Sequence, residues 1–255
     1  SQVEQWDPVH GTALARAFMP RFERAVMGAA DGVLANTELL ASRLATRYPH
    51  TPVVWVRNGF DPERLPPDGV EPHDGLLISY IGTLYGNRSL QVTLEALRLH
   101  IDRSSVPPGA ALLQVAGHAE GPYHAQFQRA VSELRLEAYV RLRGPLPGSE
   151  ALRLLRRSDL ALVLAQGQHL QVPAKLYECI GMGIPTLVVA DAGSAAAREA
   201  TALGALVVEP GDAGAIAQAF ERVHRKASAI RPAPSAEILY PDIAEHLSHL
   251  LSDPG

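Results

Sequence analysis

The 255-residue chain contains one cysteine, Cys179. A single thiol excludes an internal disulfide framework, and its apolar neighbours predict a small buried core residue. Long apolar runs are lacking too, because DLALVLA and TLVVA are far shorter than the roughly 20 residues of a membrane-spanning helix. No signal-peptide pattern opens the sequence. We therefore expect a reducing, cytoplasmic setting for this chain.

Neither sign of charge is in large excess. The chain has 23 basic and 27 acidic residues and a net charge of −4, so its composition predicts no bulk attraction to nucleic acid. It also lacks the DxD and HxxxH spacings of carboxylate or histidine ligands, and we predict no metal site. Hydrophobic residues make up 47% of the chain, which is ordinary for a globular protein that buries a core.

From residue 76 onward, apolar runs of strand length alternate with amphipathic segments of helix length. The expected strands are 76–81, 111–116, 139–143, 159–165, 185–190 and 205–209. The expected helices begin near Arg88, Pro122, Ser149, Pro173, Ser194, Asp212 and Ser235. This alternation predicts an α/β fold with a doubly wound, parallel, six-stranded, Rossmann-like sheet. Such sheets bind ligands beyond the carboxyl ends of their strands, so we expect functional residues in the loops that follow the strands.

Residues 1–61 follow a different pattern. They contain only a helix near 12–29, a strand in DGVLAN, a helix in TELLASRLATRY and a strand in TPVVWVRN. Two parallel strands do not form a self-sufficient sheet, so we predict the closing segment of an incomplete amino-terminal α/β domain. The Pro- and Asp-rich residues 62–75 then form a linker to a ligand-binding domain at 76–255.

The segment QVPAKLYECIGMGIP (171–185) follows the expected strand at 159–165. Pro173 suits the first position of a helix, where its missing N–H costs nothing. Lys175 and Glu178 are three residues apart and share one helical face near the amino terminus. They are either a solvated ion pair or part of an anion site, because free N–H groups and the helix dipole favour negative charge there.

Three other loops after strands carry weaker signals. In IGTLYGNRS (81–89), Gly82 and Gly86 free the backbone and Arg88 follows, so the loop either wraps a phosphate or only turns the chain. In AGHAEG (116–121), His118 is either a surface or capping residue or a functional one. RLRGPLPG (141–148) again has Gly and Pro after a strand, where a base could lie. The GxGxxG fingerprint is absent, which makes a dehydrogenase the least favoured reading.

The motifs VRNGFD, IGTLYG and KLYECIGMGIP succeed one another in an order and spacing that resemble the group 1 (family 4-like) glycosyltransferases of the GT-B fold. The resemblance runs from about residue 29 to 225. It implies a carboxy-terminal domain that binds a nucleotide-diphosphate sugar, with Glu178 on the ribose hydroxyls and Arg88 and Lys175 on the diphosphate. The donor-binding set that it implies is Gly82, Thr83, Gly86, Arg88, Gly117, His118, Arg143, Val172, Lys175, Leu176 and Glu178.

One departure from the family concerns the donor sugar. Many members carry an earlier Glu eight positions before the ribose Glu, where this chain has Leu170. Its role on the sugar is therefore vacant or moved to the loop Gln168–Gln171. We assign no catalytic residue from the sequence.

The resemblance implies transfer of a sugar from a nucleotide-diphosphate sugar to an acceptor, without metal or other cofactor and with retention of configuration. The acceptor is expected to be a glycan, a lipid-linked sugar or a small molecule, held mainly by an amino-terminal domain of which this chain has only the end. We thus expect a donor-binding fragment that is inactive alone, with no nucleic acid partner and with peripheral association at the inner face of the membrane left open. The alternatives are a non-catalytic nucleotide-sugar binding module and a sugar-nucleotide epimerase.

Overall fold

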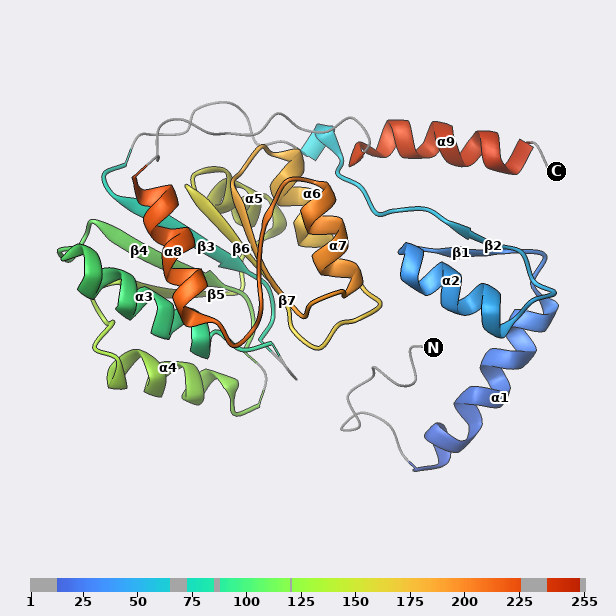
Figure 1. Cartoon of the computed structure of the whole chain (residues 1–255), viewed down its shortest axis with the longest axis horizontal. Helices are drawn as coiled ribbons and strands as arrows, with labels where there is room; N and C mark the ends of the chain where they lie inside the picture. Colours follow the sequence, from blue (N-terminus) through green and yellow to red (C-terminus); the bar gives the residue numbers. More distant parts are fainter. Residues whose placement is uncertain (1–12, 65–72, 85–87, 120, 226–237, 253–255) are drawn as a thin grey trace.

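The computed structural model describes residues 13–64, 73–84, 88–119, 121–225 and 238–252. Figure 1 shows a large part, with helices on both sides of a sheet, and a smaller part formed by α1, β1, α2 and β2. The helices are α1 (Ala13–Ala29), α2 (Glu38–Arg47), α3 (Gln91–Ser104), α4 (Tyr123–Glu133), α5 (Gly148–Arg156), α6 (Ala174–Gly181), α7 (Ala195–Ala202), α8 (Ala213–His224) and α9 (Tyr240–Ser252). The strands are β1 (Val33–Ala35), β2 (Val53–Trp55), β3 (Leu76–Ile81), β4 (Ala111–Ala116), β5 (Val140–Gly144), β6 (Leu160–Ala165), β7 (Thr186–Ala190) and β8 (Leu206–Val208). A 3₁₀ helix covers Pro62–Arg64 between the two parts.

The large part contains a parallel six-stranded sheet in the order β5-β4-β3-β6-β7-β8. The chain starts at the centre with β3, moves outward through β4 to β5, and returns to the other side of β3 for β6, β7 and β8. The expected doubly wound sheet is therefore confirmed. The winding reverses between β3 and β6, and in sheets of this kind the ligand binds at the carboxyl ends of the strands at that switch point.

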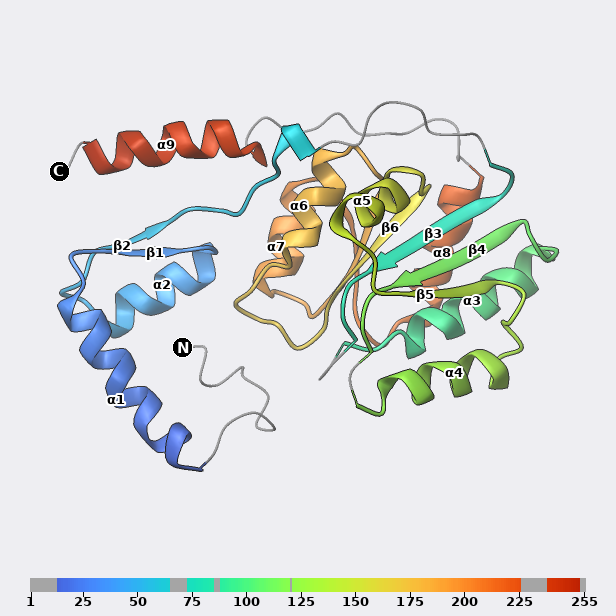
Figure 2. The same ribbon diagram turned by 180° about the vertical axis from the view of Figure 1, so that it is seen from behind.

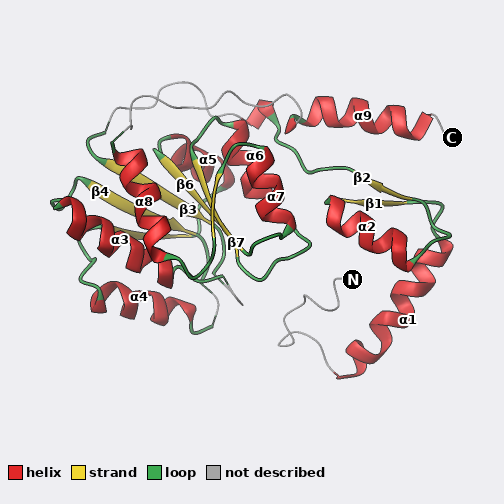
Figure 3. Ribbon diagram, viewed as in Figure 1, coloured by secondary structure: helices red, strands yellow, loops and turns green. Residues whose placement is uncertain are grey.

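Helices cover both faces of this sheet (Figure 3). α3, α4 and α8 pack on one face, and α5, α6 and α7 pack on the other. The two-residue period of a strand sends alternate side chains to the two layers, so Leu162 and Leu164 join the first and Ala161 and Val163 the second. None of these four side chains is more than 3% exposed, which explains why the strand sequences are continuously apolar.

Six of the seven helices expected after residue 76 begin later than the sequence predicts, and α9, expected near Ser235, begins at Tyr240. Pro173 has φ −59° and ψ 130°, so it is the extended N-cap residue and α6 starts at Ala174. The helix expected near Arg88 is α3, which starts at Gln91. Lys175 is consequently the second residue of α6, where a backbone N–H has no acceptor within the helix.

The smaller part is a parallel pair of strands, β1 and β2, with α2 packed on both. Thr37 caps α2, since its hydroxyl oxygen accepts a hydrogen bond from Leu40 N at 3.1 Å. Its own core is small and centres on Met27. Phe22 and Leu34 remain 65% and 55% exposed. This part is the expected partial α/β segment, and its boundary at residue 61 stays a prediction.

The two parts are joined by a strand-like contact around Phe60. Phe60 N donates to the Ile238 carbonyl at 2.7 Å, and Tyr240 N donates to the Phe60 carbonyl at 3.0 Å. The Phe60 ring lies against Gly181 of α6, where an added Cβ would be 2.3 Å from the ring. α9 then extends beside the smaller part (Figure 2). The helix expected near Ser235 is therefore a bridge between the two parts.

None of the helices in the described ranges combines the length and the apolar character that crossing a membrane requires.

Candidate functional site

The loops after β3 and β4 run side by side at the carboxyl edge of the sheet. Gly82 N donates to the Ala116 carbonyl at 2.9 Å, and Leu84 N donates to the His118 carbonyl at 2.8 Å. These bonds continue the pairing of β3 with β4 beyond the ends of the strands. The backbone of both loops is therefore fixed where a ligand of the sheet would bind.

Gly117 is required by this close approach. Its φ of +138° is one that side chains rarely adopt, and an added Cβ would lie 2.0 Å from the Gly82 carbonyl oxygen. Its N–H donates to the Gly144 carbonyl at 2.8 Å, which attaches the end of β5 to these two loops. The glycines that the sequence singles out at 82 and 117 thus face each other.

Side chains join the loop after β3 to the loop after β6, at the switch point of the sheet. Gln166, the first residue after β6, donates from Nε2 to the Ser89 carbonyl at 2.9 Å. Arg88 Nη2 donates to Gln168 Oε1 at 3.1 Å. The loop after β3 and the loop after β6 are consequently held as one unit by bonds between residues about 80 positions apart.

Backbone groups of the loop after β6 are held as well. Gly167 N donates to Asp191 Oδ2 at 2.6 Å, and Ala195 N donates to the His169 carbonyl at 2.8 Å. The Leu170 carbonyl accepts from Thr37 Oγ1 at 2.8 Å, so α2 of the smaller part also contacts this loop. The loop is therefore preorganised by three different segments.

The amide oxygen of Gln166 is buried and accepts no hydrogen bond from the described residues. The bond from its Nε2 to Ser89 fixes the plane and direction of the amide. A buried acceptor left without a donor costs about 1 to 3 kcal/mol, so such an atom marks a place for a donor group from a ligand.

Lys175 and Glu178 meet on α6 as the sequence predicts. Lys175 Nζ donates to Glu178 Oε2, and Arg64 Nη1 lies 3.8 Å from Glu178 Oε1. The Glu178 side chain is 16% exposed, against 35% for Lys175 and 54% for Arg64. A largely buried carboxylate thus lies between two more accessible cations, next to the amino terminus of α6.

The choice of lysine at position 175 is itself informative. Lys175 and Lys226 are the two lysines of the chain, and every other residue in its total of 23 basic side chains is an arginine. A compact ammonium with three rotatable donors turns between partners more easily than a planar guanidinium. Position 175 therefore fits a cation that pairs with Glu178 and can also reach a neighbouring anion.

Two residues of the expected donor set lie apart from this group. Arg143 Nε donates to Gln114 Oε1, and the Arg143 side chain lines a different pocket that contains no other member of the set. His118 contributes its carbonyl to the loop, while its side chain is exposed. The structure thus places Arg143 in a different pocket, and the expected donor contacts of Arg143 and of the His118 ring stay predictions.

Two other residues of the expected donor set, Val172 and Leu176, lie in the hydrophobic core. Val172 is 6% exposed and Leu176 is fully buried, both in the core beneath α6 and α7. Leu176 N also donates to the Pro173 carbonyl at 3.0 Å. Leu176 therefore has neither a side chain nor a free N–H to offer a ligand, and it supports α6 from below.

The last two residues of the expected donor set, Thr83 and Gly86, belong to the loop after β3. The Thr83 carbonyl accepts from the Tyr80 hydroxyl at 3.1 Å, which holds the residue beside Gly82. Gly86 falls in 85–87, outside the described residues. The expected roles of both residues stay predictions.

Neither of two buried reactive groups near α6 is suited to nucleophilic chemistry. Burial, helped by the Glu178 charge, raises the pKa of the Cys179 thiol to about 12. Burial also raises the pKa of the Tyr177 phenol, whose O–H donates to Glu199 Oε1 at 3.1 Å. Both stay protonated at neutral pH. Cys179 is also only 1% exposed, so it is the buried core residue that the sequence predicts.

In the part of the chain that the structure describes, no group of three or more His, Cys, Asp or Glu side chains could hold a metal ion.

Sequence reasoning missed four residues at this site: Gln166, Asp191, Thr37 and Arg64. Gln166 and Asp191 directly follow β6 and β7, so the signal that could have found them is a polar residue after an apolar strand. Thr37 is recognisable as an N-cap, but its bond to Leu170 spans 133 positions and has no local signal.

Comparison with known proteins agrees with this geometry. The sequence model of the family described as glycosyl transferases group 1 matches residues 75–226. A curated relative from Escherichia coli (strain K12), the putative colanic acid biosynthesis glycosyltransferase WcaL, is 28% identical over 194 residues. The match covers 74% of this chain and 46% of that protein, so the chain spans less than half the length of the relative.

Solved structures share the fold. Anabaena HepE in complex with UDP and glucose superposes with a TM-score of 0.72 at 17% identity, over 98% of this chain and 70% of that one. Sucrose-phosphate synthase from Thermosynechococcus elongatus gives 0.74 at 16% identity, over 98% and 64%. The family match covers more than half of the sequence and includes the whole six-stranded sheet. This chain therefore belongs to the group 1 glycosyltransferases and has their GT-B fold.

Proposed function

We propose that this chain binds the nucleoside diphosphate sugar of a glycosyltransferase and supplies groups that stabilise the leaving diphosphate. In the reaction, the bond from the anomeric carbon to the diphosphate oxygen breaks, an acceptor oxygen bonds to that carbon, and the acceptor hydroxyl loses its proton. The electron pair of the broken bond stays with the diphosphate. The proposal includes transfer without a metal ion and with retention of configuration.

The observation that carries the proposal is the locked junction of the loops after β3 and β6. The Arg88–Gln168 and Gln166–Ser89 bonds hold this junction at the switch point, where doubly wound sheets bind nucleotides. The buried Gln166 amide oxygen accepts no hydrogen bond from any described residue, and it suits a hydroxyl donor of the ligand. A preformed junction with an unused acceptor favours a ligand site over a purely structural loop.

The diphosphate end of the donor is assigned to α6. A phosphate at its amino terminus would meet the free N–H groups of the first turn, the positive end of the helix dipole and the Lys175 ammonium. Arg88 lies in the opposite loop and adds a second cation. Fixed positive charge of this kind stabilises a leaving diphosphate electrostatically, which is the task that a metal ion performs in other transferases.

The ribose end is assigned to Glu178. An ionised carboxylate only accepts hydrogen bonds, and vicinal ribose hydroxyls can donate two. In the ligand-free chain, Lys175 and Arg64 supply the positive partners of this carboxylate. On binding, the ribose hydroxyls would replace Lys175 as hydrogen-bond donors to Glu178, and Lys175 would then pair with the phosphate. One face of α6 would thus contact both the ribose and the diphosphate.

The sugar end of the site lacks a carboxylate at position 170. Leu170 replaces the carboxylate that many family members carry, and the neighbouring polar residues are Gln168, His169 and Gln171. Amide contacts to sugar hydroxyls would then replace a carboxylate contact. This same feature favours a second candidate, a binding module that holds the nucleotide sugar without transferring it.

The relatives suggest the partners. HepE has been solved with UDP and glucose and with UDP-glucose, which makes UDP the first nucleotide to test. The name of the E. coli relative supports a glycan acceptor. Since the match covers 46% of that relative, we propose that the acceptor is held mainly by residues of the family that precede this segment. Cytoplasmic location is part of the same proposal.

The test is a thermal-shift screen of the chain with UDP, GDP, ADP, CDP and dTDP and their sugars. A ligand that binds only the folded state raises the melting temperature, and we expect one base to do so at millimolar concentration. The Lys175→Ala variant should lose most of this rise, while Arg98→Ala, which removes a charge from the middle of α3, should keep it. If none of the nucleotides raises the melting temperature, the donor-site assignment fails.

A transfer assay with the same nucleotide sugar separates the two candidates. We expect no transfer by the 255-residue chain, because its match covers only 46% of the curated relative. We expect transfer once upstream family residues are fused to it, whereas tight binding without transfer by that fusion favours the binding module. Robust transfer by the chain alone would place a complete active site within residues 1–255.

A further inference from the structure

A groove of about 410 Å³ lies over β3, β4 and β5, on the face of the sheet that carries α5. Leu77, Leu112 and Leu154 form an apolar floor. α5 is the crossover from β5 to β6 and packs against β3, so it forms one wall, while side chains of β4 and β5 line the rest. The groove therefore forms because the crossover from β5 to β6 passes over the sheet at this side.

Arginines surround this groove. Four exposed ones come from β5 and from α5 and its end: Arg141, Arg143, Arg153 and Arg157. The lining also contains His73 and two exposed carboxylates, Asp74 and Glu150. Four arginines against two carboxylates give a local excess of positive charge, whereas the whole chain has a net charge of −4.

The arginines are partly preorganised. Arg143 Nε donates to Oε1 of Gln114, a buried polar residue that is only 4% exposed. This bond holds the Arg143 guanidinium at Nε, in a side chain that lines the groove. Within the described residues, none of Arg141, Arg143 and Arg153 forms an ion pair, so their charges are available to a ligand.

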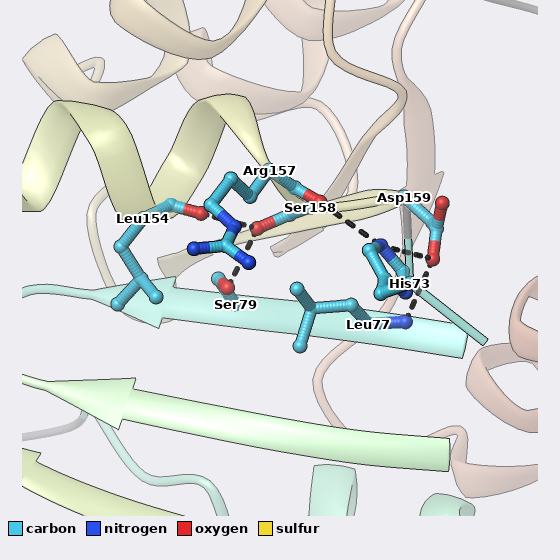
Figure 4. A network of polar contacts seen from close by, with 7 residues as sticks. All are labelled: His73, Leu77, Ser79, Leu154, Arg157, Ser158 and Asp159. Carbon is cyan, nitrogen blue, oxygen red and sulfur yellow. Dashed lines mark hydrogen bonds and ion pairs between the residues drawn. The ribbon is translucent and has the colours of Figure 1, made fainter. Parts of the chain in front are cut away.

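Buried polar contacts fix the wall against the floor, as Figure 4 shows. Ser158 Oγ donates to Ser79 Oγ at 2.6 Å and lies 2.9 Å from the Leu154 carbonyl. Leu77 N donates to Asp159 Oδ2 at 2.8 Å. The end of α5 is therefore anchored to β3, and the groove keeps its width without a ligand.

We propose that this groove binds a soluble organic phosphate, a small molecule that carries a phosphate group on an apolar body. Its volume falls within the roughly 300 to 1,000 Å³ of small-molecule sites. Guanidinium planes match phosphate oxygens in bidentate geometry, and the leucine floor removes an apolar body from water. The groove contains Arg143 and no other residue of the expected donor set, so this site is separate from the nucleotide-sugar site.

A simpler role for the same charges is protection of an edge. β5 is the last strand at one side of the sheet, and charged side chains on edge strands prevent pairing with other chains. That role requires exposed charge, but it requires neither a concave apolar floor nor a buried glutamine that aligns an arginine. It predicts that the groove binds nothing.

The probe that distinguishes these roles is phenyl phosphate, titrated calorimetrically at low ionic strength. We expect the Arg141→Ala/Arg153→Ala double variant to bind about tenfold more weakly than wild type. Arg98→Ala is the matched control, because Arg98 pairs with Asp102 on α3 and lies outside the groove. Benzyl alcohol, which lacks the phosphate group, should not bind.

Equal affinities of wild type and the double variant for phenyl phosphate would overturn the proposal. So would binding to phosphatidylglycerol vesicles together with no binding of phenyl phosphate, which would assign the arginines to a lipid surface. The Arg141→Lys/Arg153→Lys variant keeps the charge and should recover part of the affinity. Thermal melts of each variant check that loss of binding is not loss of folding.

Discussion

Replacement of Gly117 by alanine tests whether the carboxyl edge of the sheet depends on the close approach of two loops. The new Cβ would lie 2.0 Å from the Gly82 carbonyl oxygen, at a φ of +138°. The unfavourable backbone conformation costs about 1 to 2 kcal/mol. Forcing the two backbones apart adds about 1 to 3 kcal/mol, as overpacking does elsewhere in protein cores. We therefore expect Gly117→Ala to lower the free energy of unfolding by about 2 to 5 kcal/mol.

Gly204→Ala is the matched control. Gly204 also has a positive φ, of +77°, but an added Cβ there meets nothing within 4 Å. It should lose only the conformational share, about 1 to 2 kcal/mol. Urea unfolding followed by circular dichroism at 222 nm measures both variants, and the difference between them isolates the close approach.

The same substitution should also weaken nucleotide binding, because Gly82 belongs to the loop that Arg88 and Ser89 connect to the loop after β6. Gly204→Ala should leave binding intact. Equal stability losses for the two variants, or full nucleotide affinity in Gly117→Ala, would refute the reasoning that the loops must touch.

Three further predictions concern charge and protonation. Lys175→Ala should weaken nucleoside diphosphate binding but not nucleoside binding, and Glu178→Ala should weaken both, each by about 1.5 to 3 kcal/mol before solvent screening; calorimetry that shows unchanged affinities would mark a solvated pair. EDTA should leave nucleotide affinity unaltered, and a large loss would reveal a metal requirement. Burial, then the neighbouring His224, lowers the pKa of His100, so the unfolded chain takes the proton first. The contribution of His100 to stability is complete above about pH 6.5 and falls as the pH drops below it, and urea titrations of His100→Gln should show a smaller pH dependence than wild type.

Much of the fold could be predicted because it depends on short-range pattern. β6 is apolar at every position and β7 at every position after Thr186, which only a sheet covered on both faces explains. The pairing of Lys175 with Glu178 follows from their spacing on one helix. These features need no knowledge of distant parts of the chain.

The position of Arg143 in the groove has a physical cause within reach of the sequence. In VRLRG, Val140 and Leu142 alternate with Arg141 and Arg143, so the two pairs must face opposite sides of the sheet. The apolar pair faces the α3 and α4 layer, which sends both arginines to the α5 side and into the groove. The direction of alternate side chains along β5 therefore predicts the place of Arg143 better than its position near the end of the strand does.

Other contacts were beyond sequence reasoning because they join residues far apart. The Thr37–Leu170 bond, the Phe60–Gly181 packing and the Gln166–Ser89 bond each depend on how whole elements are placed. No local propensity records such a placement. A polar residue after a strand can be suspected, but its partner cannot be named.

At three positions the loop after β6 is held in place by its backbone, which lets the side chains there vary. Gly167, His169 and Leu170 are held through backbone N–H or carbonyl groups, which any residue at those positions supplies. The side chain at 170 can therefore change from carboxylate to leucine without loss of the bond to Thr37. Because the backbone stays fixed, such a change would alter the sugar end of the proposed donor site and leave its nucleotide end, with Lys175 and Glu178, in place. The departure from the family at Leu170 accordingly argues for an altered sugar preference on a retained nucleotide site.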